Sequence, residues 1–245
     1  MPGTTPADII KRLQQWGACD VKSTEILPLT KVTFLTRLGC RRALQAKVPQ
    51  RGLPGGTHPL LSEFQAGDTK IVGQAFTVKF VSKTDEAAPK LSGNYIDMIP
   101  KGAVVFISQP PPQVNAIYGG LMTLRAQVLG AAGVVIDGRV RDLSEHRALN
   151  FPLFAKAVGT TAGGEVCRPS EVNVPVRLHS DHQDAWIRPG DYIIGDLNGV
   201  VRLPQELAEQ VLEDIPAIAE ADAKCAEGIK AGRVVQEVFK AFRGR

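Results

Sequence analysis

Charged residues directly follow an apolar segment in the middle of the chain. The stretch GAAGVVIDGRVRD, residues 130–142, contains the β-branched run Val134–Ile136 and ends in Arg141 and Asp142. Such a run is typical of a strand buried on both faces. Charge where a buried strand ends marks a candidate functional site. Considered alone, an Arg-Asp pair followed by Glu145 is more often a solvated surface cluster.

A pair of glycines precedes the helix expected before this strand. In YGGLMTLRAQVL, Gly119 and Gly120 stand ahead of a first turn that contains Leu121 and Met122. Free N–H groups at a helix N-terminus, with glycines allowing close approach, can bind a carboxylate or phosphate, although a Gly-Gly pair is also a common tight turn. A helix and its return strand meet at one sheet edge, where open α/β sheets bind ligands. We therefore expect these amides and the charged pair to face one crevice.

The elements around these residues alternate between strands and helices. The pattern predicts strands at 70–81, 103–108, 134–138 and 151–159, and helices at 119–133 and 141–149. This alternation favours an α/β fold with a parallel layer and right-handed crossovers. Asp137 and Gly138 are expected to form a turn after their strand, and Gly73 is expected to mark a bulge.

The two ends of the chain differ from this central pattern. Residues 5–17 predict an amphipathic helix with Thr5 as its N-cap and Gly17 as its end. Between residues 172 and 204, short β-rich segments are separated by Pro-Gly and Asn-Gly turns, which indicates a second β layer. One or two helices rich in Glu and Lys are expected over residues 204–242.

Composition limits the class of protein. With 245 residues, 44% of them hydrophobic, the chain can bury one sizeable core. A net charge of +4 and an aromatic content of 6% argue against a nucleic-acid partner, and the basic residues within 37–51 favour a solvated or subunit-facing surface. No membrane span or signal peptide is evident. The four cysteines form no CxxC pair, so we expect reduced thiols in a cytoplasmic protein without a membrane partner.

The central block carries a family resemblance. GGLMTLRAQVLGAAGVVIDGRVRD, residues 119–142, resembles the RraA-like family, named for the regulator of ribonuclease activity A, which includes divalent-metal aldolases for 4-hydroxy-4-methyl-2-oxoglutarate. Eukaryotic enzyme-type members carry the pattern G-x20-R-D-x2-E/D, and Gly120, Arg141-Asp142 and Glu145 match it. GQAFTVKF, IPKGAVVFI and IRPGDYIIGDLNGVVRLP agree with the family as well. The resemblance covers about residues 20–215.

The resemblance implies a class II aldolase that releases pyruvate and also decarboxylates oxaloacetate through the same enolate. A hard cation, Mg²⁺ or Mn²⁺, would chelate the keto and carboxylate oxygens of the 2-oxo acid substrate. Asp142 and Glu145, three residues apart on a short helix, would bind this cation from one face. Arg141 would stabilise the enolate charge, and the amides of Leu121 and Met122 would bind the substrate carboxylate.

The resemblance also implies the architecture and the assembly. The expected fold is a swivelling β/β/α domain with mixed sheets and flanking helices, spanning residues 1–215, with a C-terminal helical extension at 216–245. Such domains assemble as homotrimers or as hexamers made of two trimers, with sites at subunit interfaces. Bacterial aldolases of the family have aspartate where Gly120 stands, so Glu145 is the natural substitute for that carboxylate.

Two other functions remain open. Family members named for ribonuclease regulation bind a nuclease or its helicase partner without chemistry, and they lack the aspartate after the arginine; Asp142 therefore favours an enzyme. The chain could also be an RraA-like lyase that acts on a different 2-oxo acid.

Weaker candidate residues lie outside this block. His179 and His182 have H-x-x-H spacing but no third ligand supplied by a helix, which disfavours a metal site. Lys79 is the lysine expected inside a strand, and Schiff-base chemistry there is disfavoured. Arg139 stands where the family usually has a small residue; it either faces solvent or alters the choice of substrate. His146 follows Glu145 and is expected to face solvent, with a place behind the metal-binding residues as the alternative.

Overall fold

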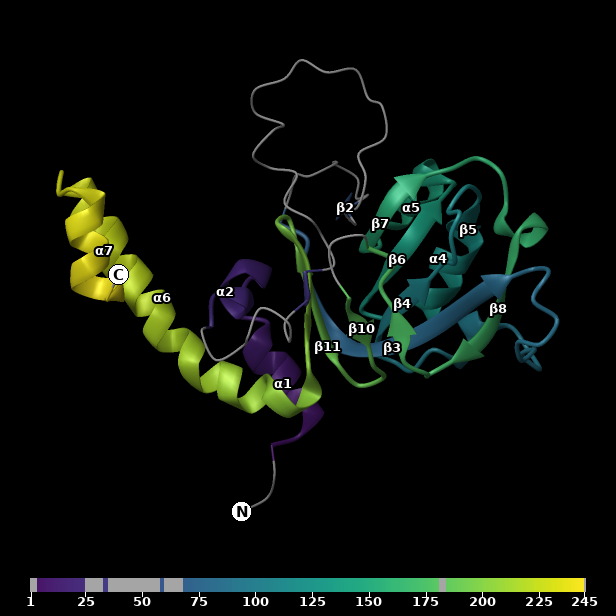
Figure 1. Cartoon of the computed structure of the whole chain (residues 1–245), viewed down its shortest axis with the longest axis horizontal. Helices are drawn as coiled ribbons and strands as arrows, with labels where there is room; N and C mark the ends of the chain where they lie inside the picture. Colours follow the sequence, from purple (N-terminus) through teal and green to yellow (C-terminus); the bar gives the residue numbers. More distant parts are fainter. Residues whose placement is uncertain (1–3, 25–32, 35–57, 60–67, 181–183, 245) are drawn as a thin grey trace.

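The structure, a computed structural model, describes residues 4–24, 33–34, 58–59, 68–180 and 184–244 (Figure 1). Its main sheet has the strand order β1-β12-β11-β3-β4-β6-β7-β2, with β5 also paired to β6 and β8 to β3. The strands of this sheet are β1 (Thr33–Phe34), β2 (His58–Pro59), β3 (Ile71–Ser82), β4 (Val104–Ser108), β5 (Ala116–Tyr118), β6 (Gly133–Val140), β7 (Leu153–Val158), β8 (Cys167–Val172), β11 (Tyr192–Asp196) and β12 (Gly199–Leu203). A separate hairpin is formed by β9 (Val176–Arg177) and β10 (Trp186–Ile187).

The centre of the sheet is parallel, as the strand and helix alternation predicts. Strands β3, β4, β6 and β7 pair in parallel in that order. Buried apolar side chains from both faces of these strands explain the continuous β-branched runs in the sequence. Parallel neighbours need crossovers, and helices provide two of them here.

The long strand β3 joins the parallel half to an antiparallel half. Its first residues pair with β11, which in turn pairs with β12, and its last residues pair with β8. The predicted bulge at Gly73 is wrong: Gly73 is in regular register with Ile193, and the irregularity lies between Lys79 and Phe80. Gly73 is required because a Cβ there would collide with the Gly102 carbonyl oxygen.

The turn predicted at Asp137 and Gly138 is also wrong, because β6 continues to Val140. A register shift after Ile136 lets the strand resume its pairing with β7. A Cβ on Gly138 would collide with the Gln109 side chain, so this glycine serves close packing rather than a turn. Tertiary pairing has overridden the local turn preference of Asp-Gly.

Helices cover the sheet and extend beyond it. They are α1 (Pro6–Leu13), α2 (Ala18–Ser23), η1 (Tyr95–Met98), α4 (Gly120–Val128), α5 (Leu143–Leu149), η2 (Gly163–Glu165), η3 (Gln205–Leu207), α6 (Ala208–Lys230) and α7 (Val235–Arg243). Thr5 caps α1 in a capping box with Asp8, as its position predicts. The helix ends at Leu13 rather than at Gly17, and Gly17 instead precedes α2.

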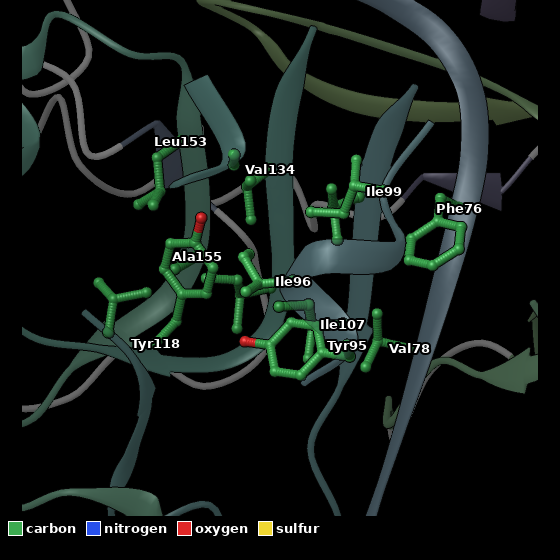
Figure 2. Close-up of a cluster of buried hydrophobic side chains, with 14 of the residues drawn as sticks. Phe76, Val78, Tyr95, Ile96, Ile99, Ile107, Tyr118, Val134, Leu153 and Ala155 are labelled. Atoms are coloured by element: carbon green, nitrogen blue, oxygen red, sulfur yellow. The ribbon is translucent and has the colours of Figure 1, made fainter. Parts of the chain in front are cut away.

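The buried apolar side chains form three clusters. One cluster lies between the parallel strands and the helices η1, α4 and α5. Figure 2 shows part of this cluster, with Tyr95, Tyr118 and Ile107 close together. A second cluster joins the other face of the parallel strands to β11 and β12, including Phe106 and Ile193. A third packs α1, α2 and the first turns of α6 against β11 and β12. The order of helices, parallel strands and antiparallel strands is a β/β/α architecture.

The C-terminal helices leave this body. The helix α6 runs out from β12, and α7 folds back on it at the far end (Figure 1). The predicted division between residues 215 and 216 falls inside α6: Ile215 is buried against the body, and Pro216 begins the outward part.

Candidate active site

The start of α4 and the end of β6 lie side by side. The Arg141 amide donates to the Tyr118 carbonyl at 3.0 Å, and the Gly120 amide donates to Asp142 Oδ2 at 3.1 Å. The crossover from β5 through α4 to β6 therefore brings residues about twenty apart in sequence to one edge of the sheet. The structure thus brings together the glycine pair and the charged residues that were expected to share a crevice.

The two glycines make room for the two carboxylates. A Cβ on Gly119 would collide with Asp142 Oδ2 and approach Arg141 Nε to 3.3 Å. A Cβ on Gly120 would collide with the Glu145 carboxylate and with its Cβ, which lies only 2.6 Å away. The space left by the missing side chains is therefore occupied by carboxylate groups from the β6–α5 junction.

Asp142 has an unusual backbone. Its φ of 61° and ψ of 44° place it in the left-handed region, where non-glycine residues are uncommon. This conformation turns the chain sharply from β6 into α5 and directs the carboxylate toward α4. Arg141 Nε lies 3.5 Å from Asp142 Oδ2, and the two side chains are 42% and 33% exposed. Left-handed non-glycine residues are a recurrent feature of functional sites.

A buried histidine lies directly beneath this turn. His146 is 2% exposed, its Nε2 is 2.6 Å from the Arg141 carbonyl oxygen, and its Nδ1 is 2.8 Å from Thr123 Oγ1. Tyr118 stacks on its ring at 6.0 Å between centroids. Burial lowers the pKa of His146, against the opposing effects of its hydrogen bond to the Arg141 carbonyl and of the nearby Asp142 and Glu145 carboxylates. The expectation that His146 faces solvent is wrong, because its partners lie on another helix and on the backbone of the turn.

The amides at the start of α4 are only partly free. The Gly120 amide donates to Asp142, and the Met122 amide donates to the Gly119 carbonyl at 3.1 Å. Among the described residues none accepts a hydrogen bond from the Leu121 amide, and the Leu121 side chain is 72% exposed. Of the two amides expected to bind a substrate carboxylate, only that of Leu121 is available.

The donor set suits a hard cation that keeps other ligands. Asp142 and Glu145 supply oxygen donors at the two glycines, and the described residues hold no group of three or more His, Cys, Asp or Glu side chains suited to a metal. Mg²⁺ characteristically binds through one or two carboxylates, with waters and substrate oxygens completing its shell. Two carboxylates at an exposed edge therefore fit such an ion.

The other singled-out residues have structural roles. Lys79 pairs with Glu171 at 2.6 Å and is 43% exposed, so it is not a desolvated amine. The buried strand lysine is Lys156 of β7, which forms an ion pair with Asp137 of β6. Asp137 Oδ2 also accepts from the His179 amide at 2.7 Å.

Two further expectations concern Arg139 and the H-x-x-H pair. Arg139 does not simply face solvent: its guanidinium donates to the Gln113 carbonyl at 2.5 Å and to that of Val158 at 2.8 Å, which ties the loop at Gln113 to the end of β7. His182 and the basic residues of 37–51 lie outside the described residues.

Among the described helices none is long and apolar enough to span a bilayer.

A hollow in the described part of the chain lies away from these residues. A cavity of about 620 Å³ is lined by residues of α1 and by the start of β3 and β4, including Ile10, Lys11, Phe76 and Lys101. None of the candidate site residues lines it. In the described part of the chain, the side chains of Arg141 and Asp142 at the glycine pair are partly exposed.

This β/β/α fold, with a glycine pair facing an Arg-Asp turn, defines a class of protein. A family model described as RraA-like, Aldolase/RraA, matches residues 45–202, and the chain belongs to that family. The fold is that of a Streptomyces coelicolor protein described as an unusual member of the RNase ES inhibitor RraA family: the TM-score is 0.68 at 18% identity, covering 94% of this chain and 99% of the other.

Sequence relatives are more closely similar over shorter stretches. An uncharacterised protein of Methanocaldococcus jannaschii is 39% identical over 125 residues, 51% of this chain and 58% of that protein. The 4-hydroxy-4-methyl-2-oxoglutarate aldolase of Thermus thermophilus is 30% identical over 104 residues, 42% of this chain and 60% of that enzyme. The chain thus aligns with less than two thirds of the length of each of these relatives.

Proposed function

We propose that this protein is a divalent-metal-dependent lyase that cleaves 4-hydroxy-4-methyl-2-oxoglutarate to pyruvate and also decarboxylates oxaloacetate. The observation that carries the proposal is the placement of two carboxylates and one guanidinium against the glycine pair of α4. The name of the Thermus thermophilus relative supports the reaction class.

In this proposal each side chain has a separate task. Asp142 and Glu145 hold Mg²⁺ or Mn²⁺, and the bound cation supplies Lewis-acid polarisation of the substrate's keto and carboxylate oxygens. The Arg141 guanidinium binds the same end of the substrate and stabilises the negative charge that develops as the carbon–carbon bond breaks. The Leu121 amide, at the positive end of the α4 dipole, donates to the substrate carboxylate.

Both reactions have the same charge requirement. Aldol cleavage and loss of CO₂ from oxaloacetate each leave an electron pair that must be delocalised into the adjacent keto group. Arg141 stabilises the negative charge in both reactions, because its guanidinium interacts with the enolate oxygen and not with the group that leaves C3. A site of this kind therefore accepts several 2-oxo acids that carry a leaving group on C3.

The exposure of the site supports assembly from several copies. Leu121, Leu124 and Val128 form an exposed apolar stripe along α4, beside the charged residues. A fixed charge stabilises an enolate far better when water is excluded. We therefore include in the proposal a homotrimer or hexamer in which a neighbouring copy covers this stripe and closes the site.

Pyruvate release from both substrates tests the proposal. The assay is run with Mg²⁺, with Mn²⁺ and with EDTA, on the wild-type protein, on Asp142→Ala and on the control Asp222→Ala, which removes an exposed carboxylate of α6. We expect turnover that needs the cation, is lost in Asp142→Ala and persists in Asp222→Ala. A folded, metal-loaded protein that releases no pyruvate from either substrate would contradict the aldolase assignment. The next assays would then use other 2-oxo acids, and after those, binding to a ribonuclease.

A further inference from the structure

The buried His146 lies on the inner side of the Arg141–Asp142 turn, where it contacts the Arg141 carbonyl, the Thr123 hydroxyl and the Tyr118 ring. Its Nε2 is 2.6 Å from the Arg141 carbonyl oxygen, which can only accept a hydrogen bond. The ring must therefore carry its proton on Nε2. In the neutral ring Nδ1 is then the acceptor, and the Thr123 hydroxyl, with Oγ1 at 2.8 Å, donates to it. Of the two neutral tautomers, only the one protonated on Nε2 satisfies both ring nitrogens.

This hydrogen bond acts on the most unusual backbone of the site. The Arg141 carbonyl belongs to the peptide that leads into the left-handed Asp142, and the Arg141 amide is held from the other side by the Tyr118 carbonyl at 3.0 Å. The His146 amide also donates to the Asp142 carbonyl at 3.2 Å. The turn is thus fixed by hydrogen bonds on both sides of Asp142, which maintains a conformation that would otherwise be disfavoured.

We infer that His146, held as the Nε2–H tautomer by Thr123, is a positioning residue that fixes the Arg141–Asp142 turn and so aims both side chains at the metal and substrate. The inference rests on the proposed function for its catalytic meaning. Its structural content, the tautomer and the turn, does not depend on which substrate the site takes. Outer residues that orient metal-binding groups change metal affinity or activity by about 10-fold to 100-fold when they are replaced.

Two replacements separate the hydrogen bond from the packing. His146→Phe keeps an aromatic ring against Tyr118 but removes the donor to the Arg141 carbonyl. His146→Gln removes the ring but retains an amide that can donate to that carbonyl. We expect His146→Phe to raise the Mn²⁺ dissociation constant about 10-fold and to lower kcat by a similar factor, with His146→Gln within about 3-fold of wild type in both.

The tautomer is measured directly, without activity. Two-bond ¹H–¹⁵N correlation spectra of the full-length protein distinguish a ring protonated on Nε2 from one protonated on Nδ1, and His146→Gln identifies the signal. We expect the Nε2–H pattern. An Nδ1–H pattern, or a His146→Phe protein that binds Mn²⁺ as tightly as wild type, overturns the inference.

Failure of the proposed function gives a different result. If the wild-type protein binds no Mn²⁺ and releases no pyruvate, the lyase proposal fails, and the positioning role is then judged on the turn itself. The three-bond coupling between the amide and α protons of Asp142 reports its φ angle. A shift of this coupling in His146→Phe and not in His146→Gln supports the positioning role, and an unchanged coupling in both refutes it.

Discussion

Replacing Gly119 by alanine perturbs the site with little effect on the scaffold around it. Gly119 has φ −140° and ψ −178°, an extended conformation that alanine adopts freely. The added methyl group collides with the Asp142 carboxylate and approaches Arg141 Nε. Both are the far ends of side chains, so the carboxylate rotates away and the backbone does not move.

The size of the effect follows from the contacts that are lost. Rotation breaks the hydrogen bond from the Gly120 amide to Asp142 Oδ2 and the 3.5 Å contact with Arg141. A hydrogen bond to a charged group contributes about 1.5–3 kcal/mol, and the partial exposure of these side chains favours the lower end. We therefore expect kcat/KM for pyruvate release to fall about tenfold in Gly119→Ala, since about 1.4 kcal/mol corresponds to a factor of ten.

A matched control isolates this effect. Gly164 in η2 has open space around the position of a Cβ, so Gly164→Ala adds the same methyl group without a collision. Gly164→Ala should unfold in urea within about 1 kcal/mol of wild type, because losing a glycine mainly changes the entropy of the unfolded chain. Gly119→Ala should be less stable than Gly164→Ala by about 1.5 kcal/mol, the contribution of the hydrogen bond that it loses. Wild-type kcat/KM in Gly119→Ala would refute the role given to the Asp142 carboxylate, and a loss equal in both variants would mark a nonspecific effect.

Three further changes have effects that the structure sets in direction and size. Gly120→Ala should lower the free energy of unfolding in urea by about 1–3 kcal/mol, because the Glu145 Cβ cannot rotate away and the two helices must separate. Lys156→Met should cost about 3–5 kcal/mol in the same assay, since it leaves Asp137 buried without its cation, and Asp137→Leu combined with Lys156→Met should recover most of that loss. Burial lowers the pKa of His179, so His179 takes up a proton more readily in the unfolded chain than in the folded one. The free energy of unfolding should therefore fall as pH drops through about 6.5. In urea unfolding at several pH values, His179→Gln should flatten this dependence of stability on pH, and an unchanged dependence would exclude His179 as its source.

Local sequence signals accounted for the elements and for their meeting at one edge. Thr5 and Asp8 form their capping box within four residues, so nothing distant can change it. Periodicity identified β4 and α4. Because a helix that leads into a parallel strand runs back along the sheet, chain connectivity was enough to place Arg141, at the end of that strand, beside the glycine pair at the start of the helix. These features depend on short-range spacing and on a chain-connectivity rule, both of which can be read from sequence.

The misjudged features depend on contacts between distant segments. Asp137-Gly138 has the composition of a turn, but β7 offers pairing partners on both sides of it and Lys156 neutralises the buried carboxylate. His146 was expected at the surface because its neighbours in sequence are charged. Its ring instead enters the space between Tyr118 and Thr123, on elements more than twenty residues away.

The glycine at position 120 and the glutamate at position 145 are sterically linked. A side chain of any size at 120 would occupy the volume that Glu145 now fills, including that of its Cβ. A chain with this backbone can therefore present its second carboxylate from α4 or from α5, but not from both. The family resemblance implies an aspartate at the α4 position in bacterial aldolases, and in the proposed site this chain uses Glu145 at the α5 position. Because α5 follows directly from the left-handed Asp142, both carboxylates here depend on one turn, whereas a carboxylate on α4 would be positioned independently of it. A change in the backbone of the Arg141–Asp142 turn would therefore displace the charged groups of Arg141, Asp142 and Glu145 together.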